Sequence, residues 1–344
     1  MERLKNPEMS HRSLPFWAWN EKLDREEIIR QIHSMKEAGA GGFFMHSREG
    51  LETEYMGEEW KQSIETAIKE AEKLGMQAWL YDEDRWPSGT AGGRVTAMGD
   101  AYRCKGLTLE VLEREQLNQI LKEDTSMDSS AGPDGKTGLT ALYAAVIHDM
   151  EITSYRRMDL NHHCHIESGE ILLAVRLEVS AASQWFNHEA PPDNLNPDCV
   201  DAFIRKTHET YKALAGSEFG RTVPGIFTDE PSLHDRHAYF GEKKGWIPWT
   251  FGFAAYFTEK TGYDFLEFLP ELYFHGTNSR KIRHDYWYTL TMRFGETYFK
   301  RIGNWCEENH LLFTGHFLQE DKMGLCARVN GGVMPHYQYQ HAGS

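Results

Sequence analysis

Residues 1–87 alternate between short apolar runs and longer stretches in which apolar residues recur every three or four positions. The runs 16–19, 42–46 and 76–81 have the length and aromatic content of buried strands. Between the first two runs, Ile28, Ile32 and Met35 share one face of a helix. A second apolar helical face runs from Trp60 to Leu74. Strands that alternate with helices of this length are typical of parallel βαβ units.

The pattern changes between about residues 102 and 186. Segments 107–112, 141–147 and 171–179 are rich in β-forming residues, and no helix of comparable amphipathicity separates them. The sequence therefore predicts an all-β subdomain inserted after the third strand.

Alternation of helix and strand returns after residue 192. Asn196-Pro197 fits a helix N-cap followed by proline at the first helical position. Further strands are indicated at 225–228 and 311–317, and a long helix from about 283 to 309 lies between them. This second part resumes the βα pattern of the first.

An α/β fold of the TIM-type (β/α) barrel class accounts for this order of elements. A closed barrel needs eight strands, whereas five are evident and residues 333–341 offer part of one more unit. We therefore expect a barrel that is incomplete at its C-terminus. Its parts are residues 1–100 with strands one to three, 101–192 with the inserted β subdomain, and 193–344 with strands four, five and a candidate sixth. An open barrel exposes an unpaired strand edge, which predicts self-association through that edge.

Composition and charge exclude several classes of function. The chain has 344 residues and a formal net charge of −15, which argues against nucleic acid or an anionic membrane as a partner. No apolar run approaches the roughly 18 residues of a membrane helix, and the polar segment 1–12 is unlike a signal peptide, so we expect a cytoplasmic protein. The five cysteines are scattered without a CxxC pair, as in reduced thiols.

Polar residues, mostly ionisable, follow every predicted parallel strand. In parallel α/β folds, ligands bind at the carboxyl ends of the strands. Acids at three strand ends repel one another unless a proton or a cation compensates, so we favour a functional site over a set of helix caps and surface ion pairs. The residues at these ends are Asn20, His46, Arg48, Asp82, Glu83, Asp84, Arg85, Trp86, Asp229, Glu230, His316, Glu320 and Asp321.

Paired carboxylates with abundant aromatic residues and no phosphate-binding loop favour glycoside hydrolysis. In that reaction one acid protonates the leaving oxygen, and a second carboxylate activates water or attacks the sugar. Glu230 and Glu320 follow the fourth and fifth parallel strands and form the candidate pair.

Two alternatives remain open at this point. One is a non-catalytic carbohydrate-binding barrel that lacks a working acid and base. The other is a metal-dependent hydrolase of another bond, in which aspartates serve as hard oxygen ligands for Ca²⁺ or Mg²⁺. Those aspartates would be Asp82, Asp84, Asp229 and Asp321.

Five ordered motifs resemble glycoside hydrolase family 106. They are PFWAWN at 15–20, GGFFMHSR at 41–48, WLYDEDRWPSG at 79–89, PGIFTDEP at 224–231 and TGHFLQED at 314–321. The resemblance covers the chain from about residue 15 to its end. It implies an α-L-rhamnosidase that acts on plant or bacterial polysaccharides with inversion at the anomeric carbon. It also implies a calcium ion near the site and a barrel with an inserted β subdomain.

Carried over motif by motif, the resemblance makes Glu230 and Glu320 the catalytic pair, without indicating which is the acid and which the base. It implies a carbohydrate partner and leaves the metal ligands unassigned. Members of the family are usually far longer, with further barrel strands and C-terminal β domains. The residues expected to contact the sugar or the calcium ion are His46, Arg48, Asp82, Asp84, Trp86, Asp229 and His316.

Overall fold

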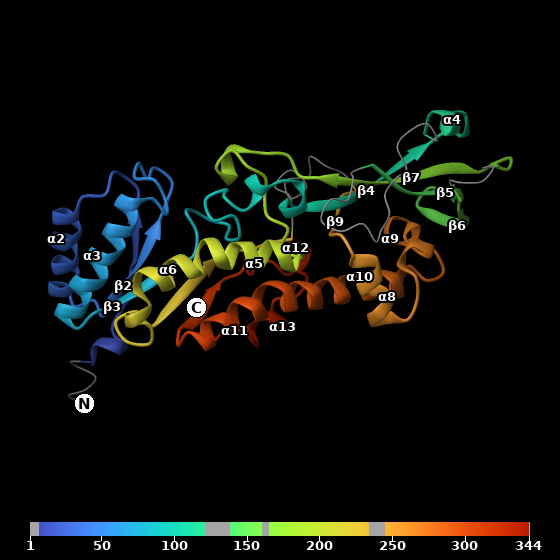
Figure 1. The fold of residues 1–344 in the computed structure, drawn as a ribbon. Coiled ribbons are helices and arrows are strands. Elements are labelled where there is room, and N and C mark those ends of the chain that lie inside the picture. The colour runs from blue at the N-terminus through green and yellow to red at the C-terminus, as the bar shows by residue number, and fades with distance from the viewer. Residues whose placement is uncertain (1–6, 121–137, 160–164, 234–244, 344) are drawn as a thin grey trace.

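Two five-stranded sheets, one parallel and one antiparallel, lie at opposite ends of an elongated molecule (Figure 1). The computed structural model describes residues 7–120, 138–159, 165–233 and 245–343. Of the helices within these ranges, none combines the length and apolar character needed to span a bilayer.

The parallel sheet contains the five strands that the apolar runs predict, side by side in chain order. This order, without reversal, matches the first five strands of a (β/α) barrel. The described residues nevertheless form an open sheet, because no pairing joins its two edge strands. A mixed α/β fold with a parallel sheet is confirmed, and an incomplete TIM-type barrel stays a prediction. The strands are β1 (Phe16–Trp19), β2 (Gly42–Ser47), β3 (Gln77–Tyr81), β8 (Gly225–Asp229) and β10 (Leu312–His316).

The two faces of the parallel sheet are both apolar but have different partners. Alternate residues such as Phe43, Leu80 and Phe313 belong to the core beneath the helices. Residues of the opposite parity, including Phe44 and Phe227, form a separate aromatic cluster. The helices that accompany this sheet are α2 (Arg25–Glu37), α3 (Glu58–Leu74), α5 (Pro197–Lys206), α6 (His208–Ala215) and α11 (Lys300–Glu308).

The start of α5 shows how the local sequence sets a helix boundary. The Asn196 side chain accepts a hydrogen bond from the Asp198 N–H at 3.0 Å, and Pro197 occupies the first helical position. The expected N-cap is therefore confirmed.

The antiparallel sheet runs in the order β6-β5-β7-β4-β9. Strands β4 (Lys105–Leu112), β5 (Gly138–His148) and β7 (Ile171–Val179) contain the three predicted segments. The sequence analysis missed β6 (Glu151–Arg157), whose residues are mostly polar and exposed, and β9 (Ile247–Trp249), which is short and contains a proline.

Strand β9 lies outside the predicted insertion. It follows β8 in the chain and pairs with β4, so that Gly106 lies opposite Pro248. The antiparallel sheet is thus built from the segment between β3 and β8 together with a strand from the second part of the chain. The predicted boundaries at residues 100 and 192 stay a prediction.

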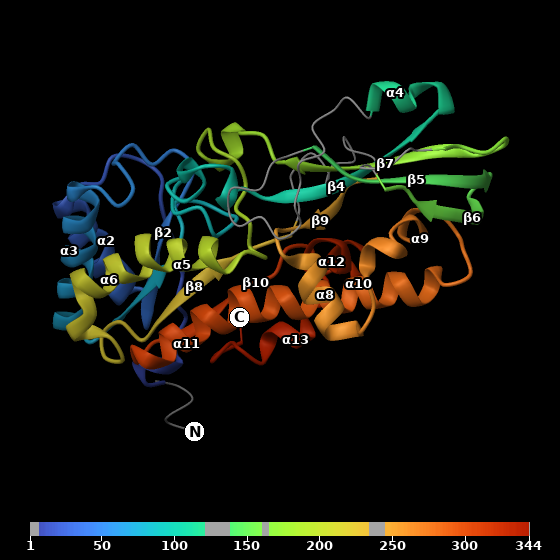
Figure 2. The same cartoon turned by 45° about the vertical axis from the view of Figure 1, so that its right-hand side comes forward.

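A nearly continuous helical rod connects the two sheets, as Figure 2 shows. Helix α10 (Ser279–Phe294) passes through a π-helical turn (Gly295–Phe299) directly into α11. At one end Tyr286 donates a hydrogen bond to the Pro248 carbonyl of β9 at 2.5 Å, and at the other α11 packs against β10. The long helix expected at about 283–309 is confirmed, with an earlier start.

Shorter helices complete the fold. The α-helices are α4 (Leu117–Ile120), α8 (Phe253–Thr261), α9 (Pro270–Tyr273), α12 (Met323–Asn330) and α13 (Met334–Tyr337). The 3₁₀ helices are Met9–His11, Thr96–Met98, Asp100–Tyr102, Arg114–Gln116, Gln184–Phe186, Gly216–Glu218 and Phe265–Glu267.

The outer edge of β10 is partly covered by the last described residues. The His341 N–H donates to the Phe313 carbonyl at 2.8 Å, and the Thr314 hydroxyl donates to the Ala342 carbonyl at 2.9 Å. Residues 333–341, expected to belong to a further unit, form α13 and the start of this contact. Self-association through an open edge stays a prediction. Within the described ranges, β1 is the edge strand without such contacts, so it is the candidate edge.

A buried ion pair joins the antiparallel sheet to the segment before α5. Lys105 of β4 is fully buried, and its ammonium donates to Asp193 Oδ2 at 3.0 Å and to two backbone carbonyls. Thr250, beside β9, donates to the same carboxylate oxygen at 2.7 Å. Each polar group in this cluster relies on the others for its hydrogen bonds, because water does not reach the cluster.

We expect Lys105→Met to lower the free energy of unfolding by about 3 kcal/mol, since it leaves the Asp193 carboxylate buried without its cation. Urea unfolding followed by circular dichroism measures this change. The matched control is Lys69→Met, which removes an exposed pair with Glu65 at 3.3 Å and should cost less than about 0.5 kcal/mol. Equal effects of the two substitutions would contradict the role of the buried pair.

Candidate functional site

Hydrogen bonds join the ends of β3 and β8. Tyr81 donates its hydroxyl to Asp229 Oδ2 at 2.8 Å. The Ser88 hydroxyl donates to Asp82 Oδ1 at 2.5 Å and accepts from the Asp229 N–H at 2.8 Å. Two strand ends that are far apart in sequence are thereby held at a fixed spacing, with their carboxylates as neighbours.

Burial changes the protonation of these two aspartates. Asp82 is fully buried, and burial raises its pKa well above the ordinary value despite the hydrogen bond from Ser88. Burial also raises the pKa of Asp229, while Tyr81 and the charges of His316 and Arg48 oppose the increase. Burial thus favours the neutral form of both carboxyl groups, and the neutral form does not repel its neighbours. The structure places Asp82 behind Asp229, away from solvent.

Glu83 anchors the loop that follows β3. Its two carboxylate oxygens accept five backbone N–H groups at 2.6–3.0 Å. Burial raises the pKa of Glu83 to about 7, although these N–H groups favour the charged form. The five donors belong to Asp84, Gly89, Thr90, Ala91 and Gly92.

The sequence analysis placed Glu83 at a strand end but gave it no role. The signal available in the sequence was the glycine-rich stretch 89–93. In the structure, Gly89, Gly92 and Gly93 have positive φ angles of 127°, 65° and 82°. Such backbone lets consecutive N–H groups converge on one anion.

Glu230 combines an unusual backbone with a raised pKa. Its φ of 50° lies in the left-handed region, and its N–H donates to the His316 carbonyl at 3.1 Å. Burial, with the neighbouring charges of Asp229 and Glu320, raises the pKa of Glu230 to about 7. Non-glycine residues in this region cluster at functional sites, where the surrounding structure holds them.

Glu320 lies on the exposed segment between β10 and α12. It accepts a hydrogen bond from the Tyr337 hydroxyl of α13 at 3.4 Å. Its charge contributes to the raised pKa of Glu230. The two glutamates follow adjacent, hydrogen-bonded strands, β8 and β10, with Glu230 half-buried and Glu320 open to solvent, and their catalytic pairing stays a prediction.

His46 is a buried imidazole at the end of β2. It is 2% exposed, and its ring lies 4.1 Å from that of Tyr81 and 5.4 Å from that of Phe16. Burial and the charge of Arg48 lower its pKa to about 4, so it is neutral at pH 7. Neither ring nitrogen has a hydrogen-bond partner among the described residues. A neutral imidazole with both nitrogens available can donate one hydrogen bond and accept another.

Arg48 and His316 lie near Asp229. The Arg48 guanidinium lies 4.7 Å above the ring of Trp86 and lowers the pKa of Asp229. His316 Nδ1 lies 3.9 Å from Asp229 Oδ1. Both residues match the predicted site set, and Asp229 is the carboxylate on which they converge.

Residues from the segment before α5 also reach this region. Trp185 contacts Trp86 with ring centroids 5.5 Å apart and the planes at 89°. Asn187 donates its side-chain amide to Asp84 Oδ2 at 2.9 Å. The sequence analysis missed Trp185 and Asn187, because it treated the segment after β7 only as the end of the insertion.

A cavity of about 330 Å³ lies against the aromatic face of the parallel sheet. It reaches the strand-end residue His316 of β10, and Phe16, the first residue of β1, also lines it. Glu230 and Glu320 do not line it. Its walls are Leu14, Phe16, Phe44, Trp79, Phe227, Thr314, His316, Ala342 and Gly343.

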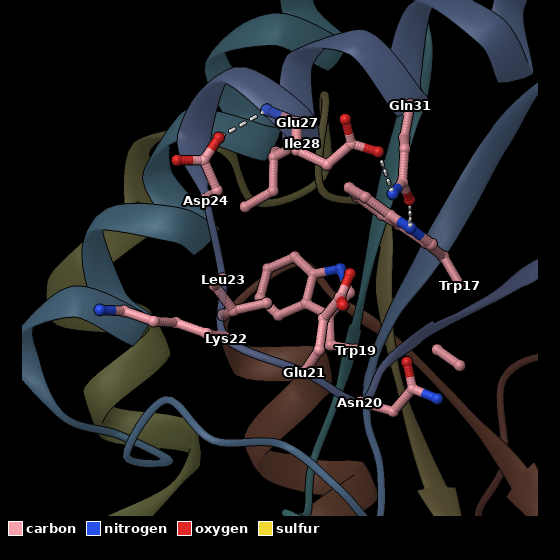
Figure 3. Close-up of a pocket in the computed structure, with 11 residues that line it drawn as sticks. Trp17, Trp19, Asn20, Glu21, Lys22, Leu23, Asp24, Glu27, Ile28 and Gln31 are labelled. Carbon is pink, nitrogen blue, oxygen red and sulfur yellow. Dashed lines mark hydrogen bonds between the residues drawn. The ribbon is translucent and has the colours of Figure 1, made fainter.

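A second, smaller pocket of about 90 Å³ lies between the end of β1 and the start of α2 (Figure 3). Its polar groups largely bind one another: Trp17 donates to Gln31 at 2.6 Å, and Asp24 accepts from the Glu27 N–H at 2.9 Å. None of the acids at the ends of β3, β8 and β10 lines it. The candidate site is therefore the strand-end cluster.

Within the described ranges, no group of three or more His, Cys, Asp and Glu side chains is arranged to hold a metal ion. Calcium prefers six to eight oxygen ligands. The described acids do not form such a set, so no chemical step is assigned to a metal.

No protein-family model matches the chain, and no curated protein matches it. Among solved structures, the chain is similar to the rhamnosidase from Novosphingobium sp. PP1Y, with a TM-score of 0.61 and 14% sequence identity. The chain has a rhamnosidase-like fold. The match covers 98% of this chain and 48% of that protein, so the chain spans about half the length of its structural neighbour. Membership of glycoside hydrolase family 106 stays a prediction.

We expect Glu83→Gln to loosen the loop over residues 84–92, because an amide nitrogen cannot accept the N–H groups that the carboxylate accepts. The free energy of unfolding should fall by about 2 kcal/mol or more. Trypsin cleavage after Arg85 or Arg94 should become faster than in the parent protein. Glu72→Gln, an exposed position on α3, is the matched control and should change neither quantity.

Proposed function

We propose that this chain carries the catalytic carboxylates of a glycoside hydrolase that removes a terminal sugar, with α-L-rhamnosides as substrates. The observation that supports this most directly is the pKa of about 7 for Glu230, to which the charge of a second carboxylate, Glu320, contributes. Glycoside hydrolysis requires two carboxyl groups, one of which holds a proton that it can donate. The rhamnosidase-like fold and the resemblance of the motifs favour the choice of sugar.

Glu230 is the better candidate for the acid. With a pKa of about 7 it is roughly half protonated at neutral pH, so it can donate a proton to the glycosidic oxygen as the bond to the anomeric carbon breaks. Glu320 then serves as the base. It takes a proton from water while the water oxygen bonds to the anomeric carbon from the opposite face, which inverts the configuration.

The other predicted residues bind and orient the sugar in this proposal. His46 is assigned a contact through its two ring nitrogens, which are buried and have no partner among the described residues. Arg48 and Asp229 place groups of opposite charge near the strand ends. Asp82 acts indirectly, because it holds Ser88, which in turn fixes the backbone of Asp229. The remaining contacts are assigned to Asp84, Trp86 and His316.

Calcium, inversion, a cytoplasmic location and self-association remain predictions. Calcium follows from the resemblance alone, and the reaction described above uses only the side chains of this chain. A chelator arm in the assay tests whether a bound cation contributes.

We expect Glu320→Gln to lower nitrophenol release from nitrophenyl α-L-rhamnoside by about 10²–10⁴-fold, because water loses its base. Glu230→Gln should slow cleavage of a rhamnosyl disaccharide by a similar factor. It should slow the nitrophenyl substrate much less, since nitrophenolate leaves without protonation. Glu72→Gln is the control of equal charge change. A panel of other aryl glycosides, with calcium and with chelator, identifies the sugar.

Three outcomes would reject the proposal in favour of an alternative. Folded protein that binds sugar but turns over no glycoside would indicate a binding barrel. Chelator-sensitive cleavage of another bond would indicate a metal-dependent hydrolase. Near-normal turnover of both substrates by either glutamate variant would remove that residue from catalysis.

We expect kcat/KM to fall as the pH rises through about 7, because the acid must be protonated to act. With a pKa of about 7 for Glu230, the protonated fraction falls about tenfold between pH 6 and pH 8. The pH profile of kcat/KM with the disaccharide measures this limb. The residual activity of Glu230→Gln should not show this fall of kcat/KM with rising pH. A profile of the parent protein that is flat from pH 6 to 8 would exclude Glu230 as the acid.

A further inference from the structure

We propose that Trp185 and Trp86 form a binding subsite for the sugar that remains attached to the leaving oxygen, so that the segment between the antiparallel sheet and α5 takes part in substrate selection. The inference rests on the proposed function, because a leaving group exists only if a glycosidic bond is cleaved. The ligand class is a pyranose linked through the scissile oxygen.

The two indole rings form a right-angled corner. Their centroids are 5.5 Å apart and their planes meet at 89°. Both side chains are partly exposed. A pyranose presents apolar C–H faces and a rim of hydroxyl groups, so one ring can lie under a face while the other bounds the rim.

Arg48 connects this corner to the carboxylates. Its guanidinium lies 4.7 Å from the Trp86 ring centre, and its charge lowers the pKa of Asp229. Ser88, two residues after Trp86 on the same loop, accepts a hydrogen bond from the Asp229 N–H at 2.8 Å, and Glu230 follows Asp229 in the chain. The corner therefore lies on the loop that contacts the strand end carrying the candidate acid, where the sugar on the leaving oxygen would lie.

The segment that carries Trp185 is held in place at both ends. The Ser183 N–H donates to the Glu189 carbonyl at 2.9 Å, which closes the loop, and Glu189 pairs with Arg103 at 3.0 Å. Asn187 donates to Asp84 on the loop that also carries Trp86. The loop after β3 thus carries Trp86 and also holds the segment that carries Trp185.

The loop contains backbone strain that these contacts must offset. Asn187 and His188 have consecutive left-handed φ angles of 57° and 64°. Left-handed backbone is strained at non-glycine residues, and less so at asparagine. Strained segments of this kind cluster at ligand sites because binding requires the geometry.

Phe186 and Trp185 divide the structural and binding roles. Phe186 is 5% exposed and fills the space beneath the loop. Trp185, next to it, is partly exposed and lies against Trp86. Phe186 therefore supplies a buried anchor for the loop, and the exposed part of the Trp185 ring can meet a ligand.

The test compares two substrates, a rhamnosyl-pyranose disaccharide and α-L-rhamnosyl fluoride, which has no sugar on the leaving side. For Trp185→Ala we expect the ratio of kcat/KM for the disaccharide to that for the fluoride to fall about tenfold, through KM. Trp185→Phe, which keeps a flat ring, should restore most of the ratio. Tyr288→Ala, an aromatic residue 60% exposed on α10, is the control and should keep the parent ratio.

Trp185→Leu covers the case in which the alanine variant does not fold, because it keeps apolar volume without a flat face. It should lower the ratio as alanine does. A parent-like ratio in either the leucine or the alanine variant would overturn the subsite while leaving the hydrolase intact. Parent protein that is folded but turns over neither substrate would overturn the hydrolase and the subsite together.

Discussion

The carboxylate of Glu83 accepts five backbone N–H groups from the loop after β3, and the rest of the site depends on the shape that this loop adopts. Ser88 on the loop fixes the backbone of Asp229, and Asp84 holds Asn187. Trp86 is on the same loop, and its ring contacts both Arg48 and Trp185. One buried anion therefore sets the positions of side chains from β2, β8 and the segment before α5.

The balance of charge at the strand ends follows from burial as much as from counter-ions. The cations that affect the pKa of Asp229 are His316 and Arg48, whereas burial is the largest cause of its increase and of that of Glu230. A cluster of acids can then persist in a chain with a net charge of −15, because burial favours the neutral form of these carboxyl groups. The same effect supplies a carboxyl group that can act as an acid near neutral pH.

Periodicity predicted the parallel strands because each is a short apolar run with a helix after it. The polar ends of those strands predicted Glu230, Asp229 and His316 as neighbours, since parallel strands present their carboxyl ends at one edge. Strand β6 was missed because its residues are mostly polar and exposed, and β9 because a three-residue strand carries no detectable period.

The roles of Glu83 and Trp185 could not be predicted for a different reason. Glu83 acts through backbone N–H groups, which every residue except proline carries, so its partners leave no mark in the pattern of side chains. Trp185 contacts a residue 99 positions earlier in the chain, and its neighbour emerges only once the insertion has folded back on the strand ends. The aspartate pair Asp82 and Asp229 shows the same limit, because order along the chain did not indicate which one lies behind the other.

The pairing of β9 with β4 has a consequence for the history and the engineering of this fold. A segment inserted into a loop can normally be excised or grafted elsewhere as a unit, because both of its ends meet at one point. Here the host chain contributes its own strand to the inserted sheet, and Tyr286 of the connecting rod binds that strand. Excision of the inserted strands would strip β9 of its partner and leave its edge unpaired. The antiparallel sheet therefore cannot be moved as a unit without altering the part of the chain that remains.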